Sequence, residues 1–538
     1  MRAVRCVPGA CQRLLALIGL LSLAGVCWAE GQPPQAAATG RSENLETNLC
    51  TEGLLMGDPR EGPSWNGWGN GPTNARFQPK SQGKLTAADL HRLELKWAFG
   101  YANTASAEPQ PTIAGGRLFA ASENSHVYAL NPRTGCRYWT YEARAGISTA
   151  AIVGHYRTAA GSDGVAVFFG DRKANAYAVD AQTGREIWVR KVDSHPAAAV
   201  TGGLAFAGTR VFVPMQGLNE AANGGFAGYP CCTFRGSLAA LDASTGNVVW
   251  KTYTVAESMP RPSNEDGAVS YGPAGGGIWS APTIDSKRRL IYVATGNGYA
   301  EPAQATTDAV LALDINTGEL KWSRQMTPGD DPSDPPEPGP DFDLSAPPVL
   351  TTLQGHPLLV VPQKSGIAWA LDPVQDGAIV WQYRFGQGSV FSGQWGLAVE
   401  GETVYVGVAD LLTPTPGGMR ALALADGHLV WAKPPQTRLC GFGQGCNAGQ
   451  GGPLTAIPGA VLSAGMDGGL RAYAAKDGAI LWSFDTNREF DTVNGVKASG
   501  GSMDSAGPVV VDGMVYVSSG SGGLSGRPGN VLLAFGLP

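Results

Sequence analysis

A short repeat that ends in tryptophan occurs eight times along this chain of 538 residues, and it constrains the fold more than any other feature. The four clearest copies read Ala-x-Asp/Asn-x-x-Thr-Gly-x-x-x-Trp and run over 129–139, 178–188, 240–250 and 312–322. Copies 421–431 and 472–482 carry Asp-Gly in place of Thr-Gly, and copy 370–381 is one residue longer. Repeats spaced by about 40–70 residues, each with several short strands, are typical of a β-propeller.

The eighth copy is split between the two ends of the chain. Trp97, in LELKWAF, lacks the first half of the repeat beside it, and the matching apolar stretch is GNVLLAFGLP at residues 529–538. Pairing of the two ends would complete the last blade and leave no free sheet edge. We therefore predict an all-β fold, an eight-bladed β-propeller whose ring is closed by the N- and C-terminal segments.

The repeat itself predicts a strand, a turn and a second strand. Apolar strands such as GRLFAAS and ETVYVGV precede it, and its Asp, Thr and Gly are turn residues, of which Gly accepts a positive φ angle. The Trp then packs flat between neighbouring blades and buries a large area. We expect all eight of these tryptophans to be core residues without a chemical role.

Composition and charge narrow the class of protein. The 75 glycines and 38 prolines suit an all-β chain with many turns. The formal net charge is −6 and no strong basic patch occurs, so nucleic acid is not expected as a partner. A propeller of this size is one domain, which we assign to residues 63–538.

The first 29 residues resemble a secretory signal. Three arginines precede the apolar run 14–26, and a small-x-small cleavage site ends at Ala29. An uncleaved anchor is the less favoured alternative, because the run is short for a membrane span. We expect a periplasmic or secreted bacterial protein without stable membrane insertion after cleavage, and a polar, Pro-rich linker over residues 30–62.

Export places the six cysteines beyond residue 29 in an oxidising compartment. The adjacent Cys231 and Cys232 are predicted to form a disulfide, although two reduced or separately paired thiols remain the alternative. The sequence leaves open whether two further pairs form, Cys50 with Cys136 and Cys440 with Cys446.

The common catalytic motifs are absent from the sequence. None of the nine cysteines lies in a Cys-x-x-Cys-His motif, so no covalent c-type haem is expected in this chain. No Gly-rich dinucleotide fingerprint, no Gly-x-Ser-x-Gly elbow and no metal-binding spacing of the six histidines occurs. An enzymatic function would therefore depend on a bound cofactor.

Four segments carry a resemblance to a known family. They are WNGWGNGPTNARFQ at 65–78, CCTFRGSLAALDASTG at 231–246, GPDFDLSAPPVL at 339–350 and PGNVLLAF at 528–535. In this order they resemble the polyvinyl alcohol dehydrogenases, and the likeness runs from about residue 60 to the C-terminus. The resemblance implies an eight-bladed quinoprotein propeller that uses pyrroloquinoline quinone (PQQ) and Ca²⁺ to oxidise alcohols.

This cofactor requires a flat apolar floor, donors for its three carboxylates, a divalent cation with oxygen ligands and a base for the alcohol proton. By resemblance, Trp279 stacks under the quinone. Asn297 and Glu220 resemble the calcium ligands of the family, with Asn219 as the alternative to Glu220.

Asp341, in DFDLSAPPVL, resembles the catalytic aspartate of the family, which would also ligate the metal. Asp343 remains an alternative, and both acids follow a Pro-rich acidic stretch in which solvated loop carboxylates are common. Lys364, in VPQKSGIAWALD, matches the position that binds the quinone oxygens.

The resemblance assigns further residues to the cofactor. Thr201 and Glu108 would face its carboxylates, with Gln110 as an alternative to Glu108, and Gln394 and Trp395 occupy the position of an Asn-Trp pair. The ring formed by Cys231 and Cys232 resembles the adjacent-cysteine ring of related quinoproteins, which comes from a different blade.

The chain also departs from the family. Relatives have an arginine near the sequence ISTA, where this chain has Ser148, and either Arg144 or Arg172 is a candidate substitute.

Two classes of function follow. The first is a periplasmic quinoprotein dehydrogenase that oxidises a secondary alcohol, including polymeric ones such as polyvinyl alcohol, and passes electrons to a separate acceptor such as a cytochrome c or a quinone. The second is a non-catalytic propeller of the bacterial envelope that binds proteins, since fold alone does not decide function. A scaffold has no reason to retain Trp279, Asn297, Asp341 and Lys364 together, so the enzyme is favoured.

Overall fold

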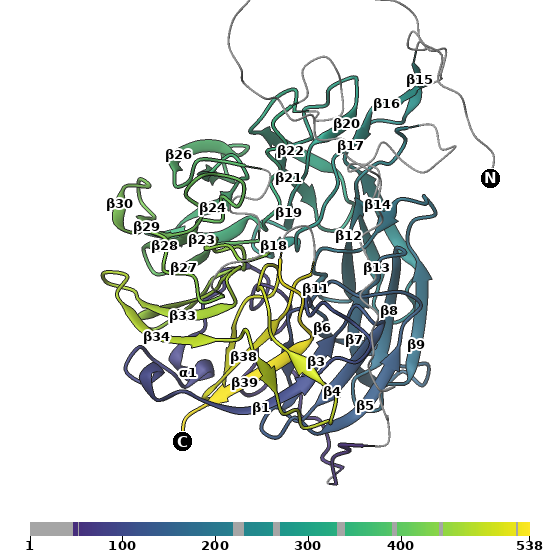
Figure 1. The fold of residues 1–538 in the computed structure, drawn as a ribbon. Helices are drawn as coiled ribbons and strands as arrows, with labels where there is room; N and C mark the ends of the chain where they lie inside the picture. The colour runs from purple at the N-terminus through teal and green to yellow at the C-terminus, as the bar shows by residue number, and fades with distance from the viewer. Residues whose placement is uncertain are drawn as a thin grey trace, which may run out of the picture. The chain divides into compact units, whose positions relative to one another are not determined.

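The computed structural model describes residues 47–51, 53–218, 231–261, 270–330, 339–389, 395–440, 445–522 and 526–538. Within these residues, seven four-stranded antiparallel sheets and one five-stranded sheet form eight blades, so the predicted eight-bladed propeller is confirmed. The blades surround a common centre (Figure 1).

The strands follow the blades in chain order. Blade 1 contains β2 (Thr112–Ala114), β3 (Arg117–Ala121), β4 (His126–Leu130) and β5 (Arg137–Glu142), and blade 2 contains β6 (Ile152–Arg157), β7 (Asp163–Gly170), β8 (Asn175–Asp180) and β9 (Glu186–Lys191). Blade 3 contains β10 (Ala198–Ala199), β11 (Ala205–Ala207), β12 (Arg210–Gly217), β13 (Ser237–Asp242) and β14 (Val248–Tyr253), and blade 4 contains β18 (Thr283–Asp285), β19 (Leu290–Ala294), β21 (Ala309–Asp314) and β22 (Leu320–Gln325).

The second half of the ring repeats this order. Blade 5 contains β23 (Val349–Leu353), β24 (His356–Pro362), β25 (Ile367–Asp372) and β26 (Ala378–Arg384), and blade 6 contains β27 (Ala398–Glu400), β28 (Thr403–Gly407), β29 (Met419–Ala423) and β30 (Leu429–Lys433). Blade 7 contains β31 (Thr455–Ile457), β32 (Ala460–Ala464), β33 (Gly469–Ala474) and β34 (Ile480–Asp485), and blade 8 contains β37 (Val509–Val511), β38 (Met514–Ser519), β39 (Val531–Gly536) and β1 (Glu94–Gly100).

Smaller elements lie outside the blades. Three two-stranded sheets pair β15 (Met259–Arg261) with β16 (Ser270–Gly272), β17 (Ala274–Gly275) with β20 (Gly298–Ala300), and β35 (Glu489–Phe490) with β36 (Ala498–Ser499). A short α1 (Lys80–Gly83) and a 3₁₀ turn (Leu90–Arg92) precede β1.

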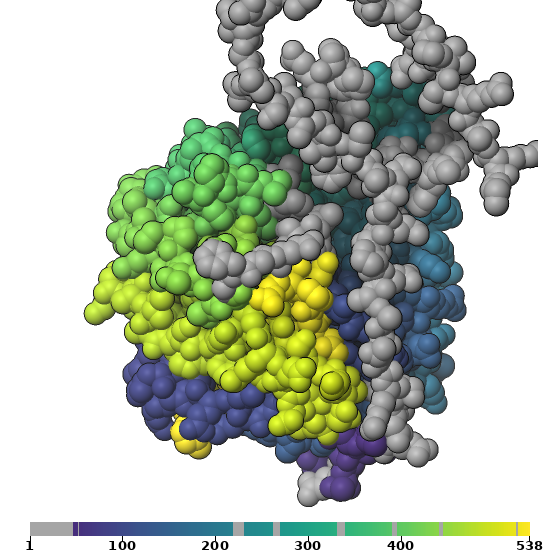
Figure 2. All heavy atoms as spheres, viewed as in Figure 1, coloured from purple at the N-terminus to yellow at the C-terminus, as the bar shows by residue number. Residues whose placement is uncertain are grey.

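The alanine and the tryptophan of each repeat face each other across the two outer strands of a blade. Ala129 pairs with Trp139, and the same pairing recurs in the next six copies. In blade 8, Ala534 of β39 pairs with Trp97 of β1, so the chain ends complete the eighth copy as predicted. The colours of the two ends meet in the space-filling view, where yellow C-terminal atoms lie beside dark-blue N-terminal atoms (Figure 2).

Seven of the eight tryptophans pack on the glycine turn of the following blade, whereas Trp482 contacts Phe535 of β39. A Cβ atom on Gly184 would lie 2.7 Å from the ring of Trp139, and the Nε1 of this Trp donates to the carbonyl of Ala181 at 3.1 Å. The glycine of the repeat has a φ of 73° at this position, so it is required both for the turn and for the space. Eight apolar clusters lie between successive blades, which places the core between the sheets.

Residues 65–78, which we call the clasp, contact every blade. Hydrogen bonds join the clasp to seven blades, and the partner residues are Ile113, Val153, Ile284, Leu350, Val399, Ala456 and Val510. At blade 3 the contact is packing, because a Cβ atom on Gly203 would lie 3.0 Å from Cβ of Trp68. The partners belong to or flank the innermost strands, so the clasp lies at the centre of the ring.

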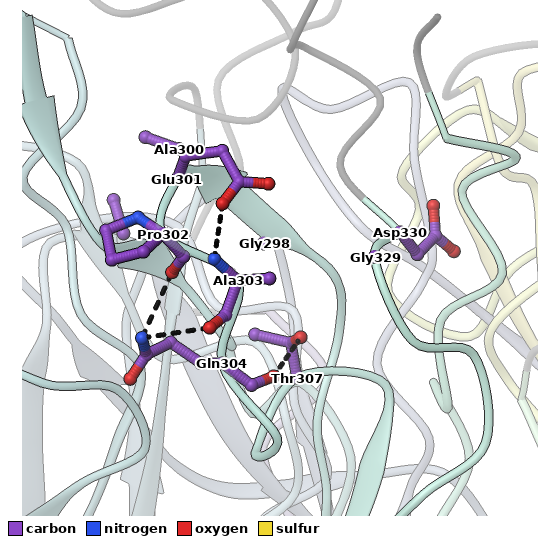
Figure 3. Close-up of a pocket in the computed structure, with 10 residues that line it drawn as sticks. Gly298, Ala300, Glu301, Pro302, Ala303, Gln304, Thr307, Gly329 and Asp330 are labelled. Atoms are coloured by element: carbon purple, nitrogen blue, oxygen red, sulfur yellow. Dashed lines mark hydrogen bonds between the residues drawn. The ribbon is translucent and has the colours of Figure 1, made fainter.

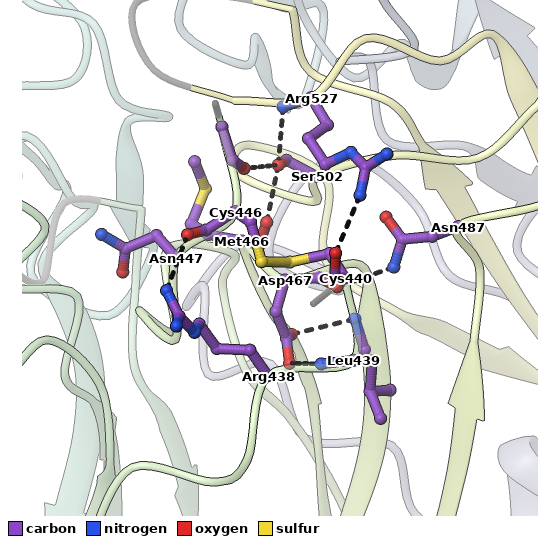
Figure 4. The surroundings of a disulfide bond; sticks show 12 residues. Arg438, Leu439, Cys440, Cys446, Asn447, Met466, Asp467, Asn487, Ser502 and Arg527 are labelled. Carbon is purple, nitrogen blue, oxygen red and sulfur yellow. Dashed lines mark hydrogen bonds between the residues drawn. A yellow bond between two sulfur atoms is a disulfide. The ribbon is translucent and has the colours of Figure 1, made fainter. Parts of the chain in front are cut away.

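Three disulfide bonds are present. Cys231 is joined to Cys232 as predicted, and the two pairs that the sequence left open, Cys50–Cys136 and Cys440–Cys446, also form. Figure 4 shows the last of these pairs, where Arg527 donates to the carbonyl of Cys440 at 3.3 Å. The hydrogen bond between Arg527 and Cys440 therefore ties the connection after blade 6 to the loop that precedes β39.

The structure allows the predictions for the N-terminal region to be compared only in part. Cys50 N–H donates to Arg137 O at 3.0 Å, so residues around Cys50 are attached to β5 although they lie within the predicted linker 30–62. The boundary between this linker and the propeller stays a prediction, and the predicted signal, residues 1–29, lies outside the described residues. Within the part of the chain that is described, no helix has the length and apolar character needed to span a membrane.

Candidate active site

Four predicted site residues meet in the loops of blades 4 and 5. The ammonium nitrogen of Lys364 lies 4.8 Å from the ring centre of Trp279 and 3.1 Å from Oδ1 of Asp341, and it also pairs with Asp343. Asp343 Oδ1 accepts a hydrogen bond from the backbone N–H of Asn297 at 2.7 Å. The structure thus brings Trp279, Asn297, Asp341 and Lys364 together around one buried cation.

The local backbone explains how these groups come so close. A Cβ atom on Gly296 would lie 2.5 Å from Asp343 Oδ1 and 3.3 Å from Trp279 Nε1, so only glycine leaves room between them. Asp341 adopts a positive φ of 57°, and residues 339–346 form no strand. Both aspartates can therefore turn toward the same lysine.

The two aspartates differ in access to solvent. The side chain of Asp341 is 27% exposed, whereas those of Asp343 and Lys364 are each 4% exposed. Burial and the charge of Asp343 raise the pKa of Asp341 to about 8, although the Lys364 ammonium opposes this shift. Asp343 and Asp341 raise the pKa of Lys364 despite its burial, so the lysine remains a cation.

Two further acids belong to this cluster and were missed in the sequence. Asp330 accepts hydrogen bonds from the N–H groups of Asp341 and Phe342 at 2.9 and 2.6 Å, which fixes the loop that carries Asp341. Asp308 is completely buried, and neither carboxylate oxygen has a hydrogen-bond partner among the described residues. Burial, followed by the charge of Asp343, raises the pKa of Asp308 well above its usual value.

Trp395 also lies at the site. Its ring centre is 6.1 Å from that of Trp279, with the rings at 80°, and its Nε1 donates to Asp504 Oδ1 at 3.0 Å. Asp504 was not identified in the sequence. The predicted neighbour of Trp395, Gln394, lies outside the described residues.

A second charged cluster surrounds Glu108. Arg172 lies 3.4 Å from Glu108 Oε2, forms an ion pair with Glu123 and donates from Nε to Ser148 Oγ at 2.7 Å. Of the two candidate arginines, Arg172 is the one whose side chain contacts Ser148. Burial, followed by the charge of Glu108, raises the pKa of Glu123 to about 7.

The two clusters are linked through one short segment. Ser505 Oγ donates to the carbonyl of Glu108 at 3.3 Å, and the preceding residue, Asp504, holds Trp395. The segment 504–505 therefore lies between Glu108 and the tryptophan pair.

Gly202, which follows Thr201 in the sequence, packs against the backbone of Trp279 and Ser280. A Cβ atom on Gly202 would lie 2.7 Å from the carbonyl oxygen of Ser280 and 2.9 Å from the carbonyl carbon of Trp279. The hydroxyl groups of Thr201 and Ser280 are buried and have no hydrogen-bond partner among the described residues. The hydroxyl of Thr149, which follows Ser148, is likewise buried and has no hydrogen-bond partner among the described residues.

The disulfide of Cys231 and Cys232 lies in a segment whose backbone is linked to Asn297. Gly275 N–H donates to Phe234 O at 2.9 Å, and Gly276 N–H donates to Asn297 O at 2.8 Å, so backbone connects this region to Asn297. The predicted metal ligand Glu220 and its alternative Asn219 lie outside the described residues. Among the residues that are described, no three His, Cys, Asp or Glu side chains converge as a metal site.

A pocket opens beside Asn297. It is lined by residues of β20 and the following loop, among them Gly298, Glu301, Gln304 and Thr307, and by Asp330 (Figure 3). Because Asp330 also holds the N–H group of Asp341, the pocket and the acidic cluster share a wall.

Comparisons with known proteins show which family the chain belongs to. The family model "Glucose/ethanol/alcohol dehydrogenase, beta-propeller domain" matches residues 227–384, and the model of outer membrane protein assembly factor BamB matches 72–225 and 415–527. A polyvinyl alcohol dehydrogenase from Pseudomonas sp. is 44% identical over 497 residues, which cover 88% of this chain and 76% of that protein. The chain belongs to the polyvinyl alcohol dehydrogenase family.

Further comparisons support the assignment. The polyvinyl alcohol dehydrogenase of Sphingopyxis sp. strain 113P3 is 38% identical, over 91% of this chain and 79% of that protein. The crystal structure of quinohemoprotein alcohol dehydrogenase ADHIIG from Pseudomonas putida HK5 has the same fold, with a TM-score of 0.66, 17% identity and coverage of 91% of this chain and 82% of the other. The prediction of a PQQ-dependent alcohol dehydrogenase is confirmed, and a non-catalytic scaffold is not favoured.

The described residues of this family member fit the cofactor. The hydroxyl groups of Thr201, Ser280 and Thr149 are buried and have no hydrogen-bond partner within the described ranges, which suits a ligand rich in carboxylates and carbonyls. The side-chain oxygen atoms of Asn297 and Asp341 are of the hard type that a divalent cation prefers, although no three described acidic side chains converge on one point.

Proposed function

We propose that this chain oxidises a secondary alcohol to a ketone, with PQQ stacked on Trp279 and a Ca²⁺ ion beside it, and that polymeric alcohols such as polyvinyl alcohol are among its substrates. The observation that carries this proposal is the contact of Lys364 with both Trp279 and Asp341. It joins a stacking surface, a cation and a carboxylate of raised pKa within one group of contacts.

The residues available to hold the cofactor surround Trp279. Lys364 is placed to bind the quinone oxygens, Thr201 and Ser280 offer hydroxyl donors, and Trp395 forms a wall at right angles to the floor. When bound, PQQ supplies a two-electron acceptor and the cation supplies Lewis acidity. Gln394 and the ring of Cys231 and Cys232 remain proposed cofactor neighbours on the resemblance alone.

The carboxylates of the cofactor need a cation beyond Lys364. Arg172 is the residue of this chain that we assign to them, because it donates to Ser148 and reaches Glu108 and Glu123. A guanidinium that is shared by two carboxylates is preorganised by them, and the raised pKa of Glu123 limits the negative charge of the cluster.

We assign the oxygen ligands of the metal to Asn297, Asp341 and Glu220. The side-chain oxygen of Asn297 and the carboxylate of Asp341 are hard ligands of the kind that Ca²⁺ prefers. Asp343 holds the backbone of Asn297, and Asp330 holds the backbone of Asp341, so the two described ligands are each fixed by a neighbouring acid.

Asp341 is the proposed general base. Its carboxylate is the more exposed of the two and has the raised pKa that suits proton abstraction near neutral pH. Asp343 is committed to Lys364 and to the N–H group of Asn297, and its burial leaves an alcohol little access. We therefore assign the proton transfer to Asp341 and a positioning role to Asp343.

Export and electron transfer complete the proposal. A cleaved signal at residues 1–29 would deliver the protein to the periplasm, and the three disulfide bonds suit that oxidising compartment. Because the sequence has no Cys-x-x-Cys-His motif, we propose that this chain carries no covalent haem and that electrons leave to a separate cytochrome c or quinone.

Reconstitution tests the proposal directly. Calorimetry of the purified apo-protein with PQQ should show one bound quinone that requires Ca²⁺ or a similar cation, and the loaded protein should reduce an artificial dye with secondary alcohols. Absence of binding at micromolar quinone and millimolar Ca²⁺ would overturn the proposed function.

A further inference from the structure

The clasp contains a fully buried arginine without an acidic partner. Arg76 is 0% exposed, and the described residues provide no ion pair for it. Its guanidinium donates to the carbonyls of Trp68 and Leu454, each at 2.5 Å, and to Thr455 Oγ1 at 3.0 Å. A buried cation held only by neutral acceptors is costly, so its surroundings must compensate.

Two tryptophans of the clasp supply part of this compensation. The guanidinium carbon of Arg76 lies 4.5 Å from the ring centre of Trp68 and 5.2 Å from that of Trp65. Such cation–π contacts are stronger in a desolvated setting. Arg76 therefore fixes both indoles in the centre of the ring.

The two indoles face different surroundings. Trp65 is 0% exposed and belongs to the apolar cluster between blades 8 and 1. Trp68 is partly exposed and lies between two glycines, because a Cβ atom on Gly396 or on Gly203 would lie 2.4 Å or 3.0 Å from it. Both glycines leave room for this one indole.

These glycines belong to the two segments that flank Trp279. Gly396 follows Trp395, whose ring meets Trp279 edge-on at 6.1 Å. Gly203 follows Gly202, which packs on the backbone of Trp279 and Ser280. Trp68 thus separates and supports the segments that carry Trp395 and Thr201.

We propose that Trp68 is a positioning residue that sets the geometry of the aromatic floor by holding the segments of Trp395 and Thr201 against Trp279. The contact runs from Arg76 through Trp68 to Gly396, and it couples the clasp to the cofactor site. A smaller side chain at position 68 would allow both segments to shift toward the centre of the propeller. The surface on which the quinone would stack would then lose its shape. The inference rests on the proposed function, because it assigns the affinity for the quinone partly to Trp68.

The test compares Trp68→Phe with the matched control Trp65→Phe in the full chain. Both variants shrink an indole that stacks on Arg76, but only position 68 faces the site. Calorimetry with PQQ and Ca²⁺ should show affinity weakened by about three- to tenfold for Trp68→Phe, the usual worth of one aromatic contact, and unchanged affinity for Trp65→Phe. Equal affinity of both variants, whether lowered or unchanged, would overturn the inference.

A second measurement needs no cofactor. The near-ultraviolet circular dichroism difference between the wild type and Trp395→Phe reports the pair of Trp395 and Trp279. This difference should change in the Trp68→Phe background and persist in the Trp65→Phe background, and an identical difference in both backgrounds contradicts the proposal. If the wild type binds no PQQ, the proposed function fails while this spectrum still decides the role of Trp68. Trp68→Tyr replaces Trp68→Phe should the latter not fold.

Discussion

The ammonium nitrogen of Lys364 lies 3.1 Å from Oδ1 of Asp341, so an almost fully buried cation faces the proposed base. The same ammonium stands over the ring of Trp279. The lysine thus holds the carboxylate of Asp341 beside the stacking surface, and the side chain of Asp341 is the more exposed of the two. Lys364 therefore orients the proposed base, and the carboxylate of Asp341 is the group that would contact the alcohol.

Asp341→Asn should abolish most alcohol oxidation and spare the binding of PQQ. Asparagine retains one oxygen for the metal but cannot accept the hydroxyl proton, so we expect a loss in turnover of about 10²–10⁴-fold. Dye-reduction kinetics and calorimetry measure the two properties separately. Asp314→Asn, in the turn of blade 4, is the control, and full activity of Asp341→Asn would exclude Asp341 as the base.

Glu123 should make the stability of the apo-protein depend on pH. Burial and Glu108 raise the pKa of Glu123 from 4.5 to about 7, so the folded state binds more protons than the unfolded state between these values. Stability is then greatest below about pH 4.5 for this group and falls as the pH rises through 7. Thermal midpoints from pH 5 to pH 8 should decline less in Glu123→Gln, and an unchanged slope would contradict the assignment.

Arg172→Gln should weaken the binding of PQQ by about 10–100-fold, the usual worth of a hydrogen bond to a charged group. Arg144→Gln is the matched control, because Arg144 was the other candidate in the sequence but Arg172 is the arginine that donates to Ser148. Titration of both variants with PQQ in the presence of Ca²⁺ decides between them. A larger loss in Arg144→Gln would reverse our choice of arginine.

Gly184→Ala should destabilise the propeller more than Gly161→Ala. Both glycines have positive φ angles, 73° and 78°, so both substitutions carry the same backbone strain. Only at Gly184 would the new Cβ meet the ring of Trp139, at 2.7 Å, whereas no atom lies within 4 Å at Gly161. We expect an additional loss of about 1–3 kcal/mol in the free energy of unfolding, measured by urea denaturation.

The repeat made the fold predictable, because the pairing of Ala129 with Trp139 recurs at a fixed spacing and Trp97 lacked its partner nearby. The resemblance to the family singled out Trp279, Asn297 and Lys364, which the structure brings close together, while their roles stay a prediction. Asp308, Asp504 and Trp68 were missed since their roles arise from contacts between distant segments. Asp341 and Asp343 could not be separated in the sequence, because their difference lies in burial and in a backbone turn that leaves both near one lysine.

The clasp has a consequence for how such a chain is made. Residues 65–78 precede every strand of the eight blades, so during synthesis they emerge before any partner exists for them. Their last hydrogen bond, from Gln78 to Val510, and the pairing of Trp97 with Ala534 must wait until nearly the whole chain is complete. In an incomplete ring, the clasp and β1 therefore lack some of their partners. We therefore expect the ring to close only after nearly the whole chain has been synthesised.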